Sequence, residues 1–248
     1  MKSFFSKKIV VGALVTATVC VSGITDAKAQ EFAVQGDIVS SYVWRGMYQG
    51  GGAAFQPTLG FGFDNFSVTA WGSTNFGGGN KELDLTLAYK LGEAGPTLTV
   101  ADLWWEGEGA YKYFNFKSHE TGHHFEAGLS YTLPVEKFPL SVAWYTMFAG
   151  KDKKLNDSGE LKQNYSSYLE LNYPFSVKNV DLNVTCGAVP YKAEGMYMNS
   201  GFAVTNVALK GMTEIKINDK FSLPIFAQAI WNPCVEDAFL VFGVTLRP

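Results

Sequence analysis

The sequence is short of charge, of cysteine and of long apolar runs. Only 17% of its 248 residues are charged and three are cysteines, whereas a soluble domain carries about 25% charged residues. Low charge combined with 47% hydrophobic residues excludes an intrinsically disordered chain. The formal net charge of −3 argues against a nucleic-acid-binding protein. Beyond the N-terminus no run approaches the roughly 20 apolar residues of a membrane-spanning helix. What remains is rich in aromatic residues and glycine, which favours β-structure.

The N-terminal segment 1–29 is predicted to be a Sec signal peptide. Three lysines within the first eight residues precede an apolar segment, 9–24, and Ala27-Lys28-Ala29 forms a cleavage site. This segment holds four of the 20 basic and one of the 23 acidic residues, so the domain 30–248 keeps 16 basic and 22 acidic residues, a net charge of −6. Export would place Cys186 and Cys234 outside the cytosol, either paired or free.

After residue 29, apolar and polar residues alternate with a period of two. In segment 82–91, for example, Leu83, Leu85 and Leu87 alternate with Asp84 and Thr86. Successive side chains of a strand point to opposite faces, so each segment has one apolar face and one polar or small face. Twelve such strands are predicted, at 31–44, 54–63, 66–73, 82–91, 97–106, 122–132, 138–149, 163–173, 178–188, 202–217, 220–231 and 237–247.

The connections between these strands alternate in length. The short ones are predicted at 64–65, 92–96, 134–137, 174–177 and 218–219, and the connections between the other pairs are mostly long and polar, the last one at 232–236 being the exception. Short periplasmic turns, longer outer loops and an even strand number are typical of transmembrane β-barrels. We therefore predict an all-β, antiparallel, up-and-down transmembrane β-barrel of about 12 strands, with 10 or 14 possible, in preference to a secreted β-sandwich.

Aromatic residues are predicted to lie near the strand ends, where their rings favour the membrane–water boundary. They are Tyr42, Trp44, Phe63, Phe66, Trp71, Tyr89, Trp104, Trp105, Tyr131, Tyr173, Phe221 and Trp231. If the apolar faces meet lipid, the opposite faces meet the lumen. The predicted pore-lining charged residues are then Asp37, Arg45, Asp84, Lys90, Glu126, Glu170, Asp181, Lys210 and Glu214.

The lumen charges allow two interpretations. They form a selectivity region whose acidic excess predicts a weak cation preference, or they pair across the barrel and seal a narrow bore. Segment 97–106 is irregular, because placing Asp102 and Glu106 in the lumen would turn Leu98, Val100 and Trp104 inward, unless the strand is bulged.

The first predicted strand and loop resemble a known opening. Ser40, Tyr42, Arg45, Gly46 and Gln49 match the S-x-Y-x-x-R-G-x-x-Q pattern of TorF-type porins and related small outer-membrane β-barrel proteins of Bacteroidetes. The resemblance implies an outer-membrane β-barrel and suggests a pore, but it supplies no solute. The chain departs from barrels of this kind by ending in Leu246-Arg247-Pro248, where an aromatic residue usually assists assembly.

The three histidines, His119, His123 and His124, lie within six residues and include an H-E-x-x-H pattern. That pattern binds zinc only on a helix, and here Gly122 interrupts it just before a predicted strand. A surface metal contact through the three histidines is a weaker hypothesis, and no cofactor is predicted. A lipid-modifying enzyme on the outer wall would need a serine beside His123, and none is evident.

The sequence therefore predicts a non-enzymatic, porin-like channel for passive diffusion of small solutes in the outer membrane of a Gram-negative bacterium. The expected partners are outer-membrane lipids, lipopolysaccharide, the barrel-assembly machinery and small solutes, and no nucleic acid. The alternatives are a sealed barrel with a surface-binding or structural role and, less favoured, an outer-membrane lipid-modifying enzyme.

Overall fold

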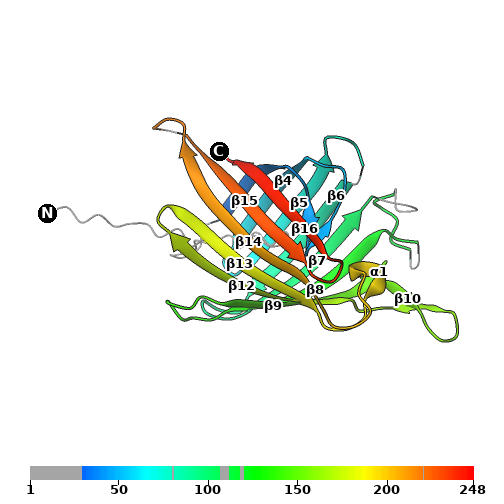
Figure 1. Cartoon of the computed structure of the whole chain (residues 1–248). Coiled ribbons are helices and arrows are strands. Elements are labelled where there is room, and N and C mark those ends of the chain that lie inside the picture. Colours follow the sequence, from blue (N-terminus) through cyan, green and yellow to red (C-terminus); the bar gives the residue numbers. More distant parts are fainter. Residues whose placement is uncertain (1–29, 80, 107–111, 118–119, 220) are drawn as a thin grey trace.

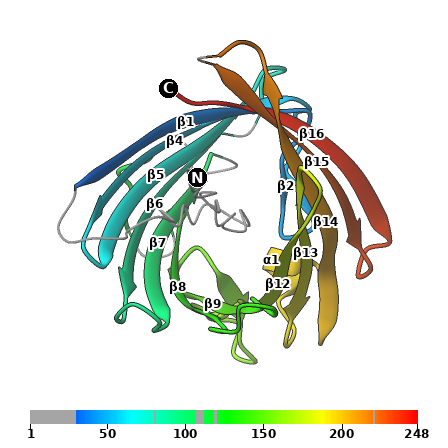
Figure 2. The ribbon, with the colours of Figure 1, turned by 90° about the vertical axis from the view of Figure 1, so that its left-hand side faces the viewer.

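Twelve long strands form a closed antiparallel barrel in the computed structural model (Figures 1 and 2). The structure describes residues 30–79, 81–106, 112–117, 120–219 and 221–248, so the predicted signal peptide lies outside it. Each strand pairs with its neighbours in chain order, and β1 closes the barrel against β16. The strands are β1 (Glu31–Val39), β4 (Ala54–Phe63), β5 (Phe66–Asn75), β6 (Lys81–Lys90), β7 (Thr97–Trp105), β8 (His123–Thr132), β9 (Ser141–Gly150), β12 (Ser167–Val177), β13 (Val180–Val189), β14 (Ala203–Lys216), β15 (Ser222–Asn232) and β16 (Asp237–Leu246).

The period-two pattern explains why these segments form a barrel with two different surfaces. On β6, Asp84 and Thr86 are buried, whereas Leu85 and Leu87 are 41% and 47% exposed. The same alternation puts large apolar side chains on the outside of the other strands and polar or small ones on the inside. The outer wall is therefore apolar, as a barrel in a lipid bilayer requires.

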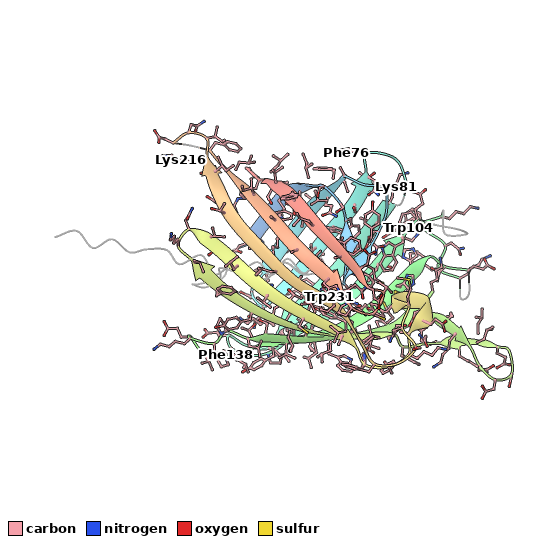
Figure 3. The ribbon with its side chains drawn as sticks, viewed as in Figure 1. Phe76, Lys81, Trp104, Phe138, Lys216 and Trp231 are labelled. Carbon is pink, nitrogen blue, oxygen red and sulfur yellow. The ribbon has the colours of Figure 1, made fainter. Side chains whose placement is uncertain are left out.

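The two ends of the barrel differ. At the end called here the turn end, short connections join β4 to β5, β6 to β7, β8 to β9, β12 to β13 and β14 to β15, and both β1 and β16 have their free ends there. The opposite, loop end carries the four longest connections, at 40–53, 106–122, 151–166 and 190–202, and two short ones, at 76–80 and 233–236. Figure 3 marks both, with Phe138 and Lys216 at the turn end and Phe76 and Lys81 at the loop end.

The loop end contains all the additional elements. They are a hairpin of β2 (Val43–Trp44) and β3 (Met47–Tyr48), a hairpin of β10 (Lys153–Leu155) and β11 (Leu161–Gln163), and the short helix α1 (Glu194–Tyr197). No helix in the described part of the chain is long and apolar enough to cross a membrane.

Four predicted boundaries are wrong by three residues or more, and two of them are the starts of the strands predicted at 138–149 and 163–173, which begin at Ser141 and Ser167. The first barrel strand ends at Val39 instead of residue 44, because the chain turns away from the wall into the β2–β3 hairpin. Strand β12 continues through Val177, although a turn was predicted at 174–177. Pro174 is tolerated there because β9 begins pairing at Ser141, opposite Asn172, so the proline lies beyond the β9 ladder.

The inward orientation expected for part of segment 97–106 is also wrong. Leu98 and Val100 are exposed on the outer face of β7, and Asp102 shares that face. The pairing of β7 with β8 is regular, so the barrel tolerates an outward carboxylate near its loop end without a bulge.

Candidate functional site in the barrel lumen

The β2–β3 hairpin and its flanks, residues 40–50, fold into the barrel and are called here the inner hairpin. Its turn residues, Arg45 and Gly46, both have positive φ, at 50° and 83°, as a two-residue type I′ turn requires. A Cβ on Gly46 would lie 1.8 Å from the Thr205 carbonyl oxygen of β14, and Asn232 Nδ2 of β15 donates to the Gly46 carbonyl at 3.0 Å. The tip therefore packs directly against the wall, and only glycine fits there.

Arg45 lies at the centre of the lumen contacts. Its two terminal nitrogens donate to Glu126 of β8 at 2.7 and 2.9 Å, and one also donates to the Tyr197 hydroxyl of α1 at 2.6 Å. A bidentate guanidinium–carboxylate pair is among the stronger polar contacts in proteins. Burial acts against the charge of Arg45, but the Glu126 carboxylate outweighs it and holds the pKa of Arg45 above its usual value.

Aromatic faces surround the same guanidinium. Its central carbon lies 4.6, 4.7 and 4.6 Å from the ring centroids of Trp44, Tyr145 and Tyr168, within range for cation–π attraction. Tyr197 stacks on Trp44 and on Tyr168, and burial raises its pKa, so its hydroxyl stays protonated. The inner hairpin and α1 thus meet across the lumen and restrict its loop-end half.

The residues of the sequence motif build this hairpin. Ser40 Oγ accepts from the Phe242 backbone of β16 at 2.9 Å, which holds the point where the chain leaves the wall. The Tyr42 ring lies 5.4 Å from that of Trp71 on β5, and the Gln49 backbone donates to the Tyr42 carbonyl at 2.9 Å. The sequence indicates a motif in this segment but does not predict that the segment folds inward, because apolar and polar residues alternate here as they do in β1.

A cavity of about 120 Å³ lies against the inner hairpin. The hairpin contributes Tyr42, Trp44 and Arg45 to its lining. The barrel wall contributes polar and charged side chains from strands that are far apart in the sequence, among them Asp37, Gln56, Asp84, Glu126, Lys210 and Gln228. The site can therefore hold a small polar molecule in contact with carboxylates, amides and aromatic rings.

The nine predicted pore-lining residues divide into two groups. Near the inner hairpin and the cavity, six are buried: Asp37, Arg45, Asp84, Glu126, Glu170 and Lys210. Toward the turn end, three are less buried: Lys90, Asp181, which accepts from Ser176 at 2.6 Å, and Glu214, which pairs with Arg247. That these residues line a conducting pore stays a prediction.

Four of the aromatic residues predicted near the membrane boundary lie inside the barrel instead. Tyr42, Trp44, Trp71 and Trp105 have inward positions and pack around the inner hairpin. From the sequence alone, these four residues look the same as aromatic residues at the membrane boundary. Only the inward fold of residues 40–50, around which they pack, shows that they lie inside the barrel. Trp231, on the outer face of β15, is 53% exposed near the loop end (Figure 3).

The histidines do not form one site. His119 lies outside the described residues, and His123 and His124, adjacent on β8, point to opposite faces. His124 points inward, with its ring 4.7 Å from that of Trp105. No group of three or more potential metal ligands is found among the residues that the structure describes.

His123 holds a loop against the outer wall. Its Nδ1 lies 2.6 Å from Asp102 Oδ1 of β7, and its Nε2 contacts the Tyr113 carbonyl oxygen. Both ring nitrogens are therefore engaged, and none is left to accept a proton from a nucleophile. Cys186, on the outer face of β13, and Cys234, in the β15–β16 turn, are both free thiols.

Comparison with known proteins adds a likeness in shape. No protein-family model and no curated protein matches the sequence. One solved structure, described as the NanC porin in a rhombohedral crystal form, superposes with a TM-score of 0.45 and 10% sequence identity, over 87% of this chain and 98% of that one. A likeness of this size carries no functional argument, so function is argued below from the chain's own residues.

Proposed function

We propose that this protein is a porin-like outer-membrane channel for passive diffusion of small solutes. The observation that carries the proposal is the closed barrel of twelve strands with an apolar outer face and a polar, charged inner face. In this proposal the signal peptide directs export to the outer membrane of a Gram-negative bacterium. The barrel-assembly machinery inserts the chain there, among lipids and lipopolysaccharide.

The passage is narrow and prefers cations. A barrel of roughly eight strands is filled by its own side chains, and one of about 16–18 strands leaves a wide aqueous channel, so a barrel of twelve strands is intermediate in width. The inner hairpin takes up part of that width. Among the buried side chains of the described barrel wall and hairpin, five are acidic (Asp37, Glu82, Asp84, Glu126 and Glu170) and two are basic (Arg45 and Lys210). Fixed charge of one sign favours ions of the opposite sign.

Conductance in planar lipid bilayers tests the proposal. The purified chain is compared with a variant in which residues 41–50 are replaced by a Gly-Ser linker of equal length, and the reversal potential is measured in a KCl gradient. We expect small, cation-selective openings for the native chain and larger ones for the variant. Anion selectivity, or no current from the native chain, would overturn the proposal.

A sealed barrel with a surface-binding role is the second candidate. The observation that favours it is the inner hairpin itself, whose Arg45 contacts β8, β9, β12 and α1 at once. In that case only the linker variant conducts, and the exposed β10–β11 hairpin at the loop end is the first surface to delete in binding assays.

A further inference from the structure

Two buried carboxylates of the lumen have no counter-ion. Glu126 is neutralised by Arg45, and Lys210 attracts Asp37. Glu82 and Asp84 of β6 are 6% and 3% exposed, and no described lysine, arginine or histidine forms an ion pair with either. The polar groups beside them carry no positive charge: Tyr42, Trp105 and Asp84 lie within hydrogen-bonding reach of Glu82, and Glu82 lies beside Asp84. A buried carboxylate of this kind is costly unless a cation or a donor approaches it.

Asp84 lines the cavity beside the inner hairpin, together with five aromatic rings, of which Tyr145 and Phe226 already face Arg45 and Lys210. Tyr42 and Trp71 touch each other at a tilt of 59°, whereas the faces of Trp44 are occupied by Arg45 and Tyr197. Arg45 does not supply the missing positive charge, because its terminal nitrogens already bind Glu126 and Tyr197. The cavity thus joins a carboxylate without a counter-ion to aromatic rings, the two chemistries that recognise organic ammonium groups.

The size of the cavity limits its occupant. Its volume of about 120 Å³ is close to the roughly 150 Å³ of an engineered protein cavity that takes benzene, so the occupant has about half a dozen heavy atoms. A metal ion fits the site less well, because no group of three potential metal ligands occurs in the described chain and the aromatic rings offer no ligand atoms.

We propose that this cavity binds a small organic ammonium cation, with Asp84 as its counter-ion and with Tyr42 and Trp71 as its aromatic walls. Glu82, two residues away on the same face of β6, adds negative charge behind Asp84. The inference rests on the proposed function, since it names a class of solute for a cation-preferring channel.

Isothermal titration of the full-length protein in detergent with choline tests the site. The matched ligand is 3,3-dimethyl-1-butanol, which has the shape of choline without its charge. We expect choline to bind at millimolar concentration and the neutral alcohol at least ten-fold more weakly. This comparison needs no variant, so it does not depend on how a substitution folds.

Variants then assign the residues. Asp84→Asn is expected to weaken choline binding at least ten-fold and Trp71→Leu about five-fold. Asp219→Asn removes an exposed carboxylate at the turn end and is expected to change binding less than two-fold. Each barrel is checked by its heat-dependent shift on gel electrophoresis. Equal binding of the two ligands, no heat from choline, or an unaltered Asp84→Asn protein would overturn the site.

Bilayer conductance separates this inference from the proposed function. If KCl currents appear but choline does not bind, the channel stands and the ammonium site is wrong. If choline binds in the predicted pattern but the native chain does not conduct, the site stands and the channel proposal is wrong.

Discussion

At the scale of single residues, Arg45 and Glu126 form a buried ion pair whose two members depend on each other. Glu126→Gln leaves the guanidinium buried with one neutral partner, and breaking such a pair costs about 3–5 kcal/mol. We expect the folded barrel to unfold at lower urea concentration in lipid vesicles. The double variant Arg45→Gln/Glu126→Gln, which removes both charges, is expected to recover part of the loss. Equal stability of Glu126→Gln and the native chain would contradict the central role of the pair.

Gly46 allows a prediction with a matched control. Gly46→Ala would force a Cβ into the Thr205 carbonyl, whereas Gly52→Ala adds a Cβ with nothing within 4 Å, and both glycines have positive φ. Both substitutions add the backbone strain of a left-handed residue, about 1–3 kcal/mol, and only Gly46→Ala displaces the hairpin tip. We expect larger bilayer currents from Gly46→Ala alone. The same current from both variants would mean that strain, and not the contact with β14, controls the hairpin.

At the scale of elements, the sequence predicts the strands of the barrel wall better than it predicts the inner hairpin that fills part of the lumen. Each strand is recognisable because its alternation is local, and the turn at residues 64–65 needs only its own residues. The inner hairpin is different. Tyr42 and Trp44 continue the apolar parity of β1, and only contacts with β8, β15 and α1, distant in the chain, make them turn inward.

The outward Asp102 was missed for the same reason. A single carboxylate among the apolar residues of a strand predicts that this face of the strand points into the lumen. In β7 the face points outward, and His123 of the next strand lies beside Asp102. The register of β7 against β8 brings Asp102 and His123 together, and the sequence does not show this register.

The loop that His123 holds can be released by one substitution. Asp102→Asn replaces the carboxylate that positions the imidazole ring, whose other nitrogen contacts the Tyr113 carbonyl. We expect segment 112–117, which contains Lys112 and Lys117, to be cut faster by trypsin in intact vesicles, by several-fold. Asp157→Asn, in the exposed β10–β11 loop, is the control and should leave this cleavage rate unchanged. Unaltered cleavage of Asp102→Asn would show that aromatic packing of Tyr113 and Phe116 is sufficient.

At the scale of the whole molecule, the shortage of charge reflects two barrel surfaces of different polarity. The outer wall carries almost no charge, and the charge that the barrel retains is buried inside, near the inner hairpin, or lies in loops and turns. A soluble β-protein with the same composition would bury its leucines, whereas here Leu59, Leu85, Leu98, Leu209 and Leu240 are all exposed.

Arginine placed on each surface in turn measures this difference. Leu85→Arg, in the middle of β6 and facing outward, puts a charge where we expect lipid, at a cost of about 2–4 kcal/mol. Ala88→Arg lies three residues on, faces the lumen of the same strand, and is expected to cost less than about 1 kcal/mol, because water reaches that surface. Urea unfolding in phospholipid vesicles gives both values. If the two arginines destabilise the barrel equally, the outer wall does not face lipid, and the membrane location is wrong together with the channel built on it.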